Sequence, residues 1–186
     1  MEDAERNKAS KNFAINLSAD RQYSADAIRA VLSTILFHRL FGTLVPSTSE
    51  AVGVTYPVPV HPETESIISQ RAKELAHRFR DSAIKTQAVQ LRFFSRRVKK
   101  SAWFAKTHNF CWESWNVAVA VSPNSKDRPG LLDTGQENQS SSRSASSREL
   151  QKALFETIQA LDDYKDHIPP ITTTDVSPFP YEITIE

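Results

Sequence analysis

The stretch SADAIRAVLSTILFHRLFG, residues 24–42, predicts an apolar helix. Ser24 stands at an N-cap position, and Gly42 is a residue that commonly ends a helix. Between them the apolar side chains recur with the helical period, so we expect a helix at about 24–41. Its apolar stripe consists of Ile28, Val31, Leu32, Ile35 and Leu36.

Two further segments have helical patterns. Pro62 followed by acidic residues is typical of a first helical turn, and the apolar period predicts a helix at about 62–84. Ser146 and Glu149 form a capping box before a third helix that reaches about Lys165. The apolar face of that third helix is expected to comprise Leu150, Leu154, Ile158 and Leu161.

Alternating apolar and polar residues predict strands between and beyond these helices. Residues 51–60 are rich in β-formers but contain two prolines, so they form either an edge strand or an extended loop. Taken together, the element order predicts an α+β fold with three helices packed on a mainly antiparallel sheet. The predicted strands are 13–17, 89–93, 115–121 and the terminal PYEITIE, 180–186.

Two segments are expected to be disordered. Residues 1–10 are polar, and residues 122–147 are rich in serine, asparagine and glutamine, which cannot bury enough apolar surface to order the chain. We therefore expect a short disordered lead, 1–10, and a single domain at 11–186. That domain contains a disordered serine-rich insert at about 123–147.

The composition excludes several classes of protein. With 23 basic and 22 acidic residues the formal net charge is +1, which predicts no nucleic-acid partner. The single cysteine, Cys111, excludes an internal disulfide and a cysteine-based zinc site, and it suits a reducing compartment. The N-terminus has no apolar secretory segment, and no run of about 18 apolar residues predicts a transmembrane segment. We expect a cytoplasmic protein.

No motif predicts catalysis. The five histidines lack the spacing of a helical zinc site, and the nucleophile and phosphate-loop motifs are absent from the sequence. We therefore predict no enzyme activity, no catalytic residue, no cofactor and no metal.

The segment RFFSRRVKKSAWFAK, residues 92–106, has six positive charges and no acid. It is either a solvated strand end and loop or a docking patch for an acidic partner or anionic lipid head groups. The candidate patch consists of Arg96, Arg97, Lys99, Lys100 and Lys106, with Arg92 as the sixth positive charge.

Trp103 and Phe104 lie in this segment, in a predicted connection of about a dozen residues between two strands. Adjacent side chains of an extended chain point to opposite faces, so one core hardly accommodates both rings. We expect two projecting aromatic anchors of the kind enriched at binding sites. The alternative is that Trp103 folds back on the sheet edge.

Two other tryptophans are interpreted differently. Trp115 is in phase with the valines that follow it and is expected in the core. Trp112 is out of phase and is expected to pack under the projecting connection, with an interface role as the alternative. Beyond these, Phe37, His38 and Phe41 form a candidate dimer surface, because apolar residues there widen the first helix beyond one face. The alternative is that this helix is buried all round.

Three motifs support a resemblance to a known family: Phe37-His38-Arg39, Trp103-Phe104, and Trp112-Glu113-x-Trp115. With them, most of 13–122 and, more weakly, 148–185 resemble the autophagy-related protein 101 family. The resemblance implies a HORMA fold, the architecture shared with a spindle-checkpoint protein.

The resemblance also implies a function. Members of the family form a heterodimer with the HORMA domain of autophagy-related protein 13, stabilise it, and belong to the kinase complex that initiates autophagy. An exposed aromatic pair, the WF finger, recruits downstream factors to the phagophore assembly site. By similarity, Trp103 and Phe104 are that finger in a non-enzymatic adaptor, with peripheral membrane proximity and no nucleic acid.

Two alternative functions remain open at this point. One is a checkpoint-like module that clamps a partner peptide with its C-terminal segment, and the other is a membrane-binding module that uses the basic loop. Because the sequence ends at Glu186, soon after the terminal strand, we expect no long peptide-wrapping segment and one locked conformation.

Overall fold

The computed structural model describes residues 10–42, 45–81, 83–100, 105–122, 135–173 and 175–186, with side chains described except at 97–100, 105–107 and 135–139. Its helical elements are a short 3-10 turn, η2 (Arg21–Tyr23), and three α-helices, α1 (Ser24–Phe37), α2 (Pro62–Arg78) and α3 (Gly135–Asp163). The strands are β1 (Lys11–Asp20), β2 (Pro46–Ala51), β3 (Val54–Pro59), β4 (Thr86–Lys100), β5 (Ala105–Ser122) and β6 (Tyr181–Ile185).

The main sheet has four strands in the order β1-β5-β4-β6. β4 pairs antiparallel with both β5 and β6, whereas β1 pairs parallel with β5. The expected α+β class is confirmed, with a mixed sheet in which antiparallel pairing predominates.

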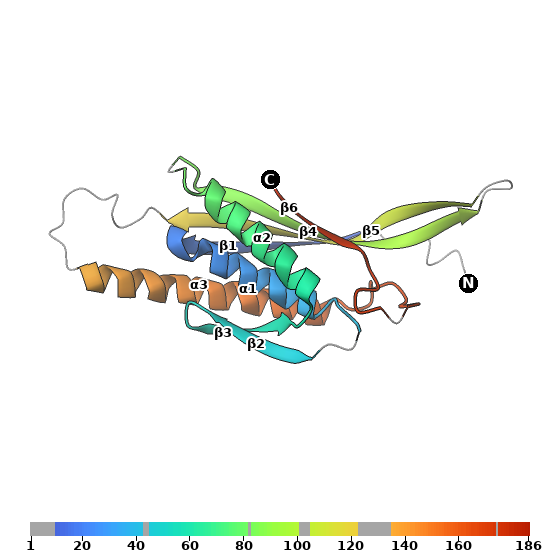
Figure 1. The fold of residues 1–186 in the computed structure, drawn as a ribbon, viewed down its shortest axis with the longest axis horizontal. Helices are drawn as coiled ribbons and strands as arrows, with labels where there is room; N and C mark the ends of the chain where they lie inside the picture. The colour runs from blue at the N-terminus through green and yellow to red at the C-terminus, as the bar shows by residue number, and fades with distance from the viewer. Residues whose placement is uncertain (1–9, 43–44, 82, 101–104, 123–134, 174) are drawn as a thin grey trace.

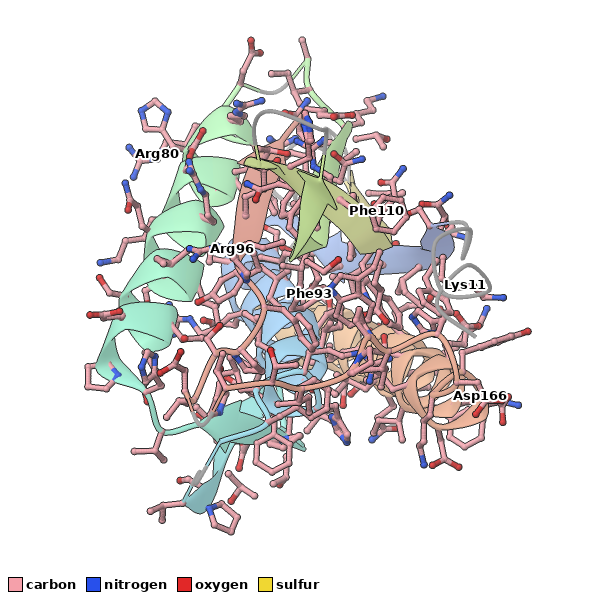
Figure 2. All side chains as sticks on the ribbon, turned by 90° about the vertical axis from the view of Figure 1, so that its right-hand side faces the viewer. Lys11, Arg80, Phe93, Arg96, Phe110 and Asp166 are labelled. Carbon is pink, nitrogen blue, oxygen red and sulfur yellow. The ribbon has the colours of Figure 1, made fainter. Side chains whose placement is uncertain are left out.

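The helices form a layer on one side of this sheet. α1 lies between α2 and α3, and the β2–β3 hairpin lies on the far side of the helices (Figures 1 and 2). α1 is buried on its predicted stripe and also at Ala27, Ala30, Ser33 and Thr34. The extra apolar surface of this helix is therefore explained largely by its central position.

β3 lies within segment 51–60, for which the two prolines allowed either an edge strand or an extended loop. It pairs antiparallel with β2 in a separate two-stranded sheet, which the sequence analysis did not predict. Pro57 and Pro59 are tolerated because a strand of a two-stranded sheet has one unpaired edge.

α1 and α2 are shorter than predicted, ending at Phe37 and Arg78 rather than near 41 and 84. At the end of α1 a ring nitrogen of His38 lies 2.8 Å from the carbonyl oxygen of Thr34 and engages a carbonyl of the last turn. Gly42 does not end the helix. A Cβ at Gly42 would lie 2.4 Å from the Cα of Val176, so glycine is needed there because the C-terminal segment crosses closely.

α3 differs most from its prediction. It begins at Gly135, so residues 135–147 of the expected disordered insert are helical, while 1–9 and 123–134 lie outside the described residues. Ser146 is not an N-cap; its hydroxyl oxygen accepts a hydrogen bond from the backbone N–H of Asp20 at 2.9 Å. Ile158, expected in the core, is exposed. The buried side chains of this helix include Ser146, Leu150, Ala153, Leu154, Thr157 and Leu161.

Candidate functional site

β4 and β5 continue past the main sheet as a two-stranded arm. β1 pairs with β5 only from Glu113 onward, and β6 pairs with β4 only as far as Phe93. The arm therefore comprises 94–100 and 105–111, and it projects beyond the helical layer (Figure 1). The predicted connection of about a dozen residues is wrong, because the strands are separated only by 101–104. The alternation of apolar and polar residues that predicts a strand is weak in the arm, because no core covers the arm.

Trp103 and Phe104 lie in 101–104, outside the described residues. Their presentation stays a prediction. What the structure adds is the position of the strand ends that flank them, Lys100 and Ala105, which are opposite one another in register.

The basic patch belongs to this arm. Arg96 is exposed, and the register places Lys99 opposite Lys106. Arg97 and Lys100 are also arm residues by backbone position, and their side chains are not described. Arg92 stands apart from the patch, because it lies in the main sheet and pairs with Glu182.

A β-bulge lies at the base of the arm. Phe93 is opposite Glu113, but Phe94 is opposite Cys111, which leaves Trp112 as the extra residue. Such a bulge bends the strand and increases its twist. It also turns the out-of-phase Trp112 into the core, where its ring centroid lies 5.7 Å from that of Phe93. The expectation that Trp112 packs under the connection is wrong, whereas Trp115 is in the core as predicted.

Beside the bulge lies a buried polar cluster centred on Glu113. The Nε–H of Arg39 donates to both carboxylate oxygens, at 2.9 and 3.0 Å. The indole N–H of Trp115 donates to Oε1 at 2.6 Å, and Nε2 of His167 lies 2.6 Å from Oε2. The cluster joins the end of α1, the base of the arm and the start of the C-terminal segment.

The electrostatics of the cluster favour the ionised carboxylate. Burial by itself would raise the pKa of Glu113, but the hydrogen bonds from His167 and Arg39, followed by the charge of Arg39 and the bond from Trp115, outweigh it and lower the pKa. Glu113 and Arg39 are therefore an ion pair at neutral pH. Sequence reasoning missed this pair. The available signal was that Glu113 shares the phase of Trp115 and so points toward the core.

The C-terminal segment is attached to the body at several points. The Phe179 ring packs 4.9 Å from Trp112, and the N–H of Gly42 donates to the carbonyl oxygen of Val176 at 3.3 Å. The hydroxyls of Tyr181 and Thr64 are hydrogen-bonded at 2.9 Å. Burial raises the pKa of Tyr181, although the bond with Thr64 opposes the shift. The segment ends as β6, paired with β4.

The candidate dimer surface is only partly available. Phe37 and His38 are half-buried, and the Phe41 ring packs 6.0 Å from that of Phe179. A more exposed apolar surface lies on α3, where Phe155 and Ile158 have exposed fractions of 69% and 44%. We call these two residues the α3 face; sequence reasoning assigned Ile158 to the core and did not single out Phe155.

The α3 face and the end of α1 are neighbours. The pKa of Asp162, one helical turn beyond Ile158, is lowered first by its hydrogen bond with Lys165 and also by the nearby His38. His38, just beyond the end of α1, therefore lies near the last turn of α3.

Within the described ranges, no three His, Cys, Asp or Glu side chains are grouped so that they could hold a metal ion. Over the same ranges, no helix combines the length and apolar character needed to cross a membrane.

Comparison with known proteins gives a consistent result. A family model described as Autophagy-related protein 101 matches residues 16–175. The chain is 30% identical to autophagy-related protein 101 of Arabidopsis thaliana, over 86% of this chain and 79% of that protein. It is also 30% identical to autophagy-related protein 101 of Schizosaccharomyces pombe, over 91% of this chain and 83% of that protein. The matched span includes the aromatic pair and the whole buried cluster.

Proposed function

The chain belongs to the autophagy-related protein 101 family, and from this premise we propose that it is a non-enzymatic HORMA adaptor of the autophagy-initiation kinase complex. In this role it pairs with the HORMA domain of autophagy-related protein 13 and stabilises it. At the phagophore assembly site it recruits downstream autophagy factors through Trp103 and Phe104.

The observation that supports the recruiting role most directly is the arm. Strand pairing continues from Phe94 to Lys100, which corresponds to about 20 Å beyond the sheet at the usual rise per residue. A buried ion pair and a bulge fix the base of the arm. An aromatic pair in the connection at its end is suited to reach a partner that does not touch the body.

We assign the basic patch to the same recruiting role. The register places Lys99 opposite Lys106, and like charges at opposite positions weaken a two-stranded ribbon. An acidic partner surface would relieve this repulsion, so we assign the patch to steering such a surface toward the aromatic pair.

The α3 face is the surface that we assign to the HORMA partner. Phe155 and Ile158 are both exposed and lie three residues apart on one helix, and His38 lies near Asp162 in the last turn of the same helix. Leaving two large apolar side chains in water costs roughly 1.5–3 kcal/mol each. A partner that covers them recovers that free energy.

The attached C-terminal segment favours the adaptor over a peptide clamp. A clamp needs a C-terminal segment that opens and recloses around a ligand. Here His167 is bound to Glu113, Tyr181 to Thr64, and Glu186 exchanges backbone hydrogen bonds with Ala88 at 2.8 and 3.2 Å. Opening would break all of these contacts.

Co-expression with the HORMA domain of autophagy-related protein 13 tests the dimer surface. The Phe155→Ser/Ile158→Ser variant should lose co-purification, whereas Ile67→Ser, which removes an exposed apolar side chain from α2, should retain it. Equal co-purification of both variants would exclude the α3 face.

The recruiting role is tested by Trp103→Ala/Phe104→Ala in the full complex. This variant should retain the heterodimer but fail to bring downstream factors to assembly sites, scored by fluorescence imaging. An unfolded double variant, or one with normal recruitment, would refute the finger.

A further inference from the structure

We propose that the free edge of β1, with the groove between β1 and α3, binds an extended basic segment of a partner protein as an added strand. This surface is distinct from the arm and from the α3 face.

β1 is an edge strand of the main sheet, so among the described residues one side of its backbone has no strand partner. The side is identified by Asp20, whose N–H points away from β5 and donates to Ser146 on α3. In an extended strand the N–H and C=O of one residue point the same way, and alternate residues face opposite edges. Outward backbone groups therefore belong to the even-numbered residues Asn12, Ala14, Asn16 and Ser18.

This edge lacks the features that usually prevent strand addition. Natural edge strands are commonly protected by proline, by charged side chains or by bulges. Between Asn12 and Ser18, β1 contains no proline and no charged residue, and its register with β5 is unbroken. The one lysine of β1, Lys11, lies at the strand's first position.

A groove of about 310 Å³ runs along this edge. One wall is formed by β1 and the other by the last turns of α3. Figure 2 shows the molecule end-on, with Lys11 at the start of β1 and Asp166 just after α3 labelled. An added strand would lie beside Ala14 with alternate side chains facing α3. The groove is lined by Phe13, Ala14 and Ile15 from β1 and by Glu156, Gln159, Ala160, Asp163 and Tyr164 from α3 and its end.

The charges of the groove select basic side chains. Glu156 and Asp163 are its ionisable acids, and within the described residues neither has an ion-pair partner. They lie about 10 Å apart along the helix. Side chains on one face of a strand recur about every 7 Å, so long basic side chains at alternate positions reach both carboxylates.

The aromatic wall of the groove already holds a cation. The Nζ of Lys11 lies 3.8 Å from the centre of the Tyr164 ring, a cation–π contact. Tyr164 is exposed, and its ring is tilted against Phe13 with centroids 5.6 Å apart. Backbone donors and acceptors, two free carboxylates and an aromatic wall together fit an extended segment in which Lys or Arg alternates with apolar residues.

The test uses the full chain and two labelled eight-residue peptides, one alternating lysine and valine and one alternating glutamate and valine. Fluorescence anisotropy should detect the lysine peptide alone, with affinity that falls as salt rises. Amide hydrogen exchange by NMR should show new protection at Ala14 and Asn16 and none at Phe13 and Ile15, whose N–H groups already face β5.

Two variants and a matched control separate the contributions. Ala14→Pro removes one outward N–H at a position where an edge strand tolerates proline, and it should weaken the lysine peptide about tenfold. Glu50→Gln/Glu65→Gln, which removes the same charge from exposed positions outside the groove, should bind as the original chain does. Glu156→Gln/Asp163→Asn should weaken binding and abolish its salt dependence.

Several results would overturn the proposal. Equal binding of the two peptides, unchanged binding by Glu156→Gln/Asp163→Asn, or protection spread evenly over odd and even residues would each do so. If Ala14→Pro does not fold, the proposal is still tested by the exchange pattern of the original chain and by peptide binding to Glu156→Gln/Asp163→Asn. If sedimentation shows that the free chain dimerises and Ala14→Pro makes it monomeric, the edge binds a second copy and the basic-partner assignment is wrong.

Discussion

Arg39 at the end of α1 and Glu113 on β5 form an ion pair across 74 residues of sequence, and their side chains are 2% and 0% exposed. Arg39 belongs to the Phe37-His38-Arg39 motif and Glu113 to the Trp112-Glu113-x-Trp115 motif. Two of the three motifs on which the family resemblance rested therefore meet in the interior, at the base of the arm.

Removing one partner of this pair should destabilise the protein strongly. Arg39→Met leaves a buried carboxylate without its cation, which costs about 3–5 kcal/mol of unfolding free energy. The measurement is urea denaturation at pH 7. Arg71→Met is the control, because the pair of Arg71 with Glu74 is more than one-third exposed and is expected to contribute less than about 1 kcal/mol. Equal losses in the two variants would contradict this assignment.

Stability should fall with acid in a way that depends on Glu113. The pKa of Glu113 is lowered in the folded protein, so its contribution is present above the unfolded value of about 4.3 and is lost as the pH falls below it. Urea denaturation from pH 7 to pH 3 should show this loss. Glu113→Gln should be less stable at pH 7 and show a shallower acid dependence; a parallel pH profile would argue against ionised Glu113.

Gly42→Ala should loosen the C-terminal segment. The new methyl group would lie 2.4 Å from the Cα of Val176, so the backbone must shift, at a cost of about 1–3 kcal/mol. Hydrogen exchange of 175–186 should accelerate. At Gly53 a Cβ has open space, and Gly53→Ala, strained by its φ of +80°, should leave exchange in 175–186 unchanged. No acceleration in Gly42→Ala would show that the contact relaxes freely.

The aromatic pair and the bulge tryptophan should respond oppositely to truncation. Trp103→Ala/Phe104→Ala should change the unfolding free energy by less than about 0.5 kcal/mol, as expected for side chains outside the core. Trp112→Ala, which empties a site between Phe93 and Phe179, should cost about 3–5 kcal/mol. Comparable losses in the two variants would mean that the pair is part of the core.

The sequence predicted the structure correctly where apolar residues recur with the period of a single helix or strand. The stripe of α1, the burial of Trp115 in phase with the valines that follow it, and the terminal strand were all predicted, because each element faces one core and repeats accordingly. The family was also recognised from short motifs, and that assignment is confirmed.

The period of apolar residues did not predict elements that lie outside the core or that depend on contacts with a distant segment. The arm has no core face, so its strands had no pattern to reveal them. The serine-rich start of α3 is attached to β1 across the fold, since Ser146 accepts a hydrogen bond from the backbone N–H of Asp20 and Ser142 donates one to the Asp20 carboxylate.

By itself, then, the sequence determined the fold class, the central helix and the family. Tertiary structure alone decided that Arg39 neutralises Glu113, that a bulge turns Trp112 inward, that Gly42 makes room for Val176, and that Ile158 faces solvent. The physical reason is shared by all four: each depends on which distant segment approaches, and a one-dimensional pattern records only the spacing of neighbours along the chain.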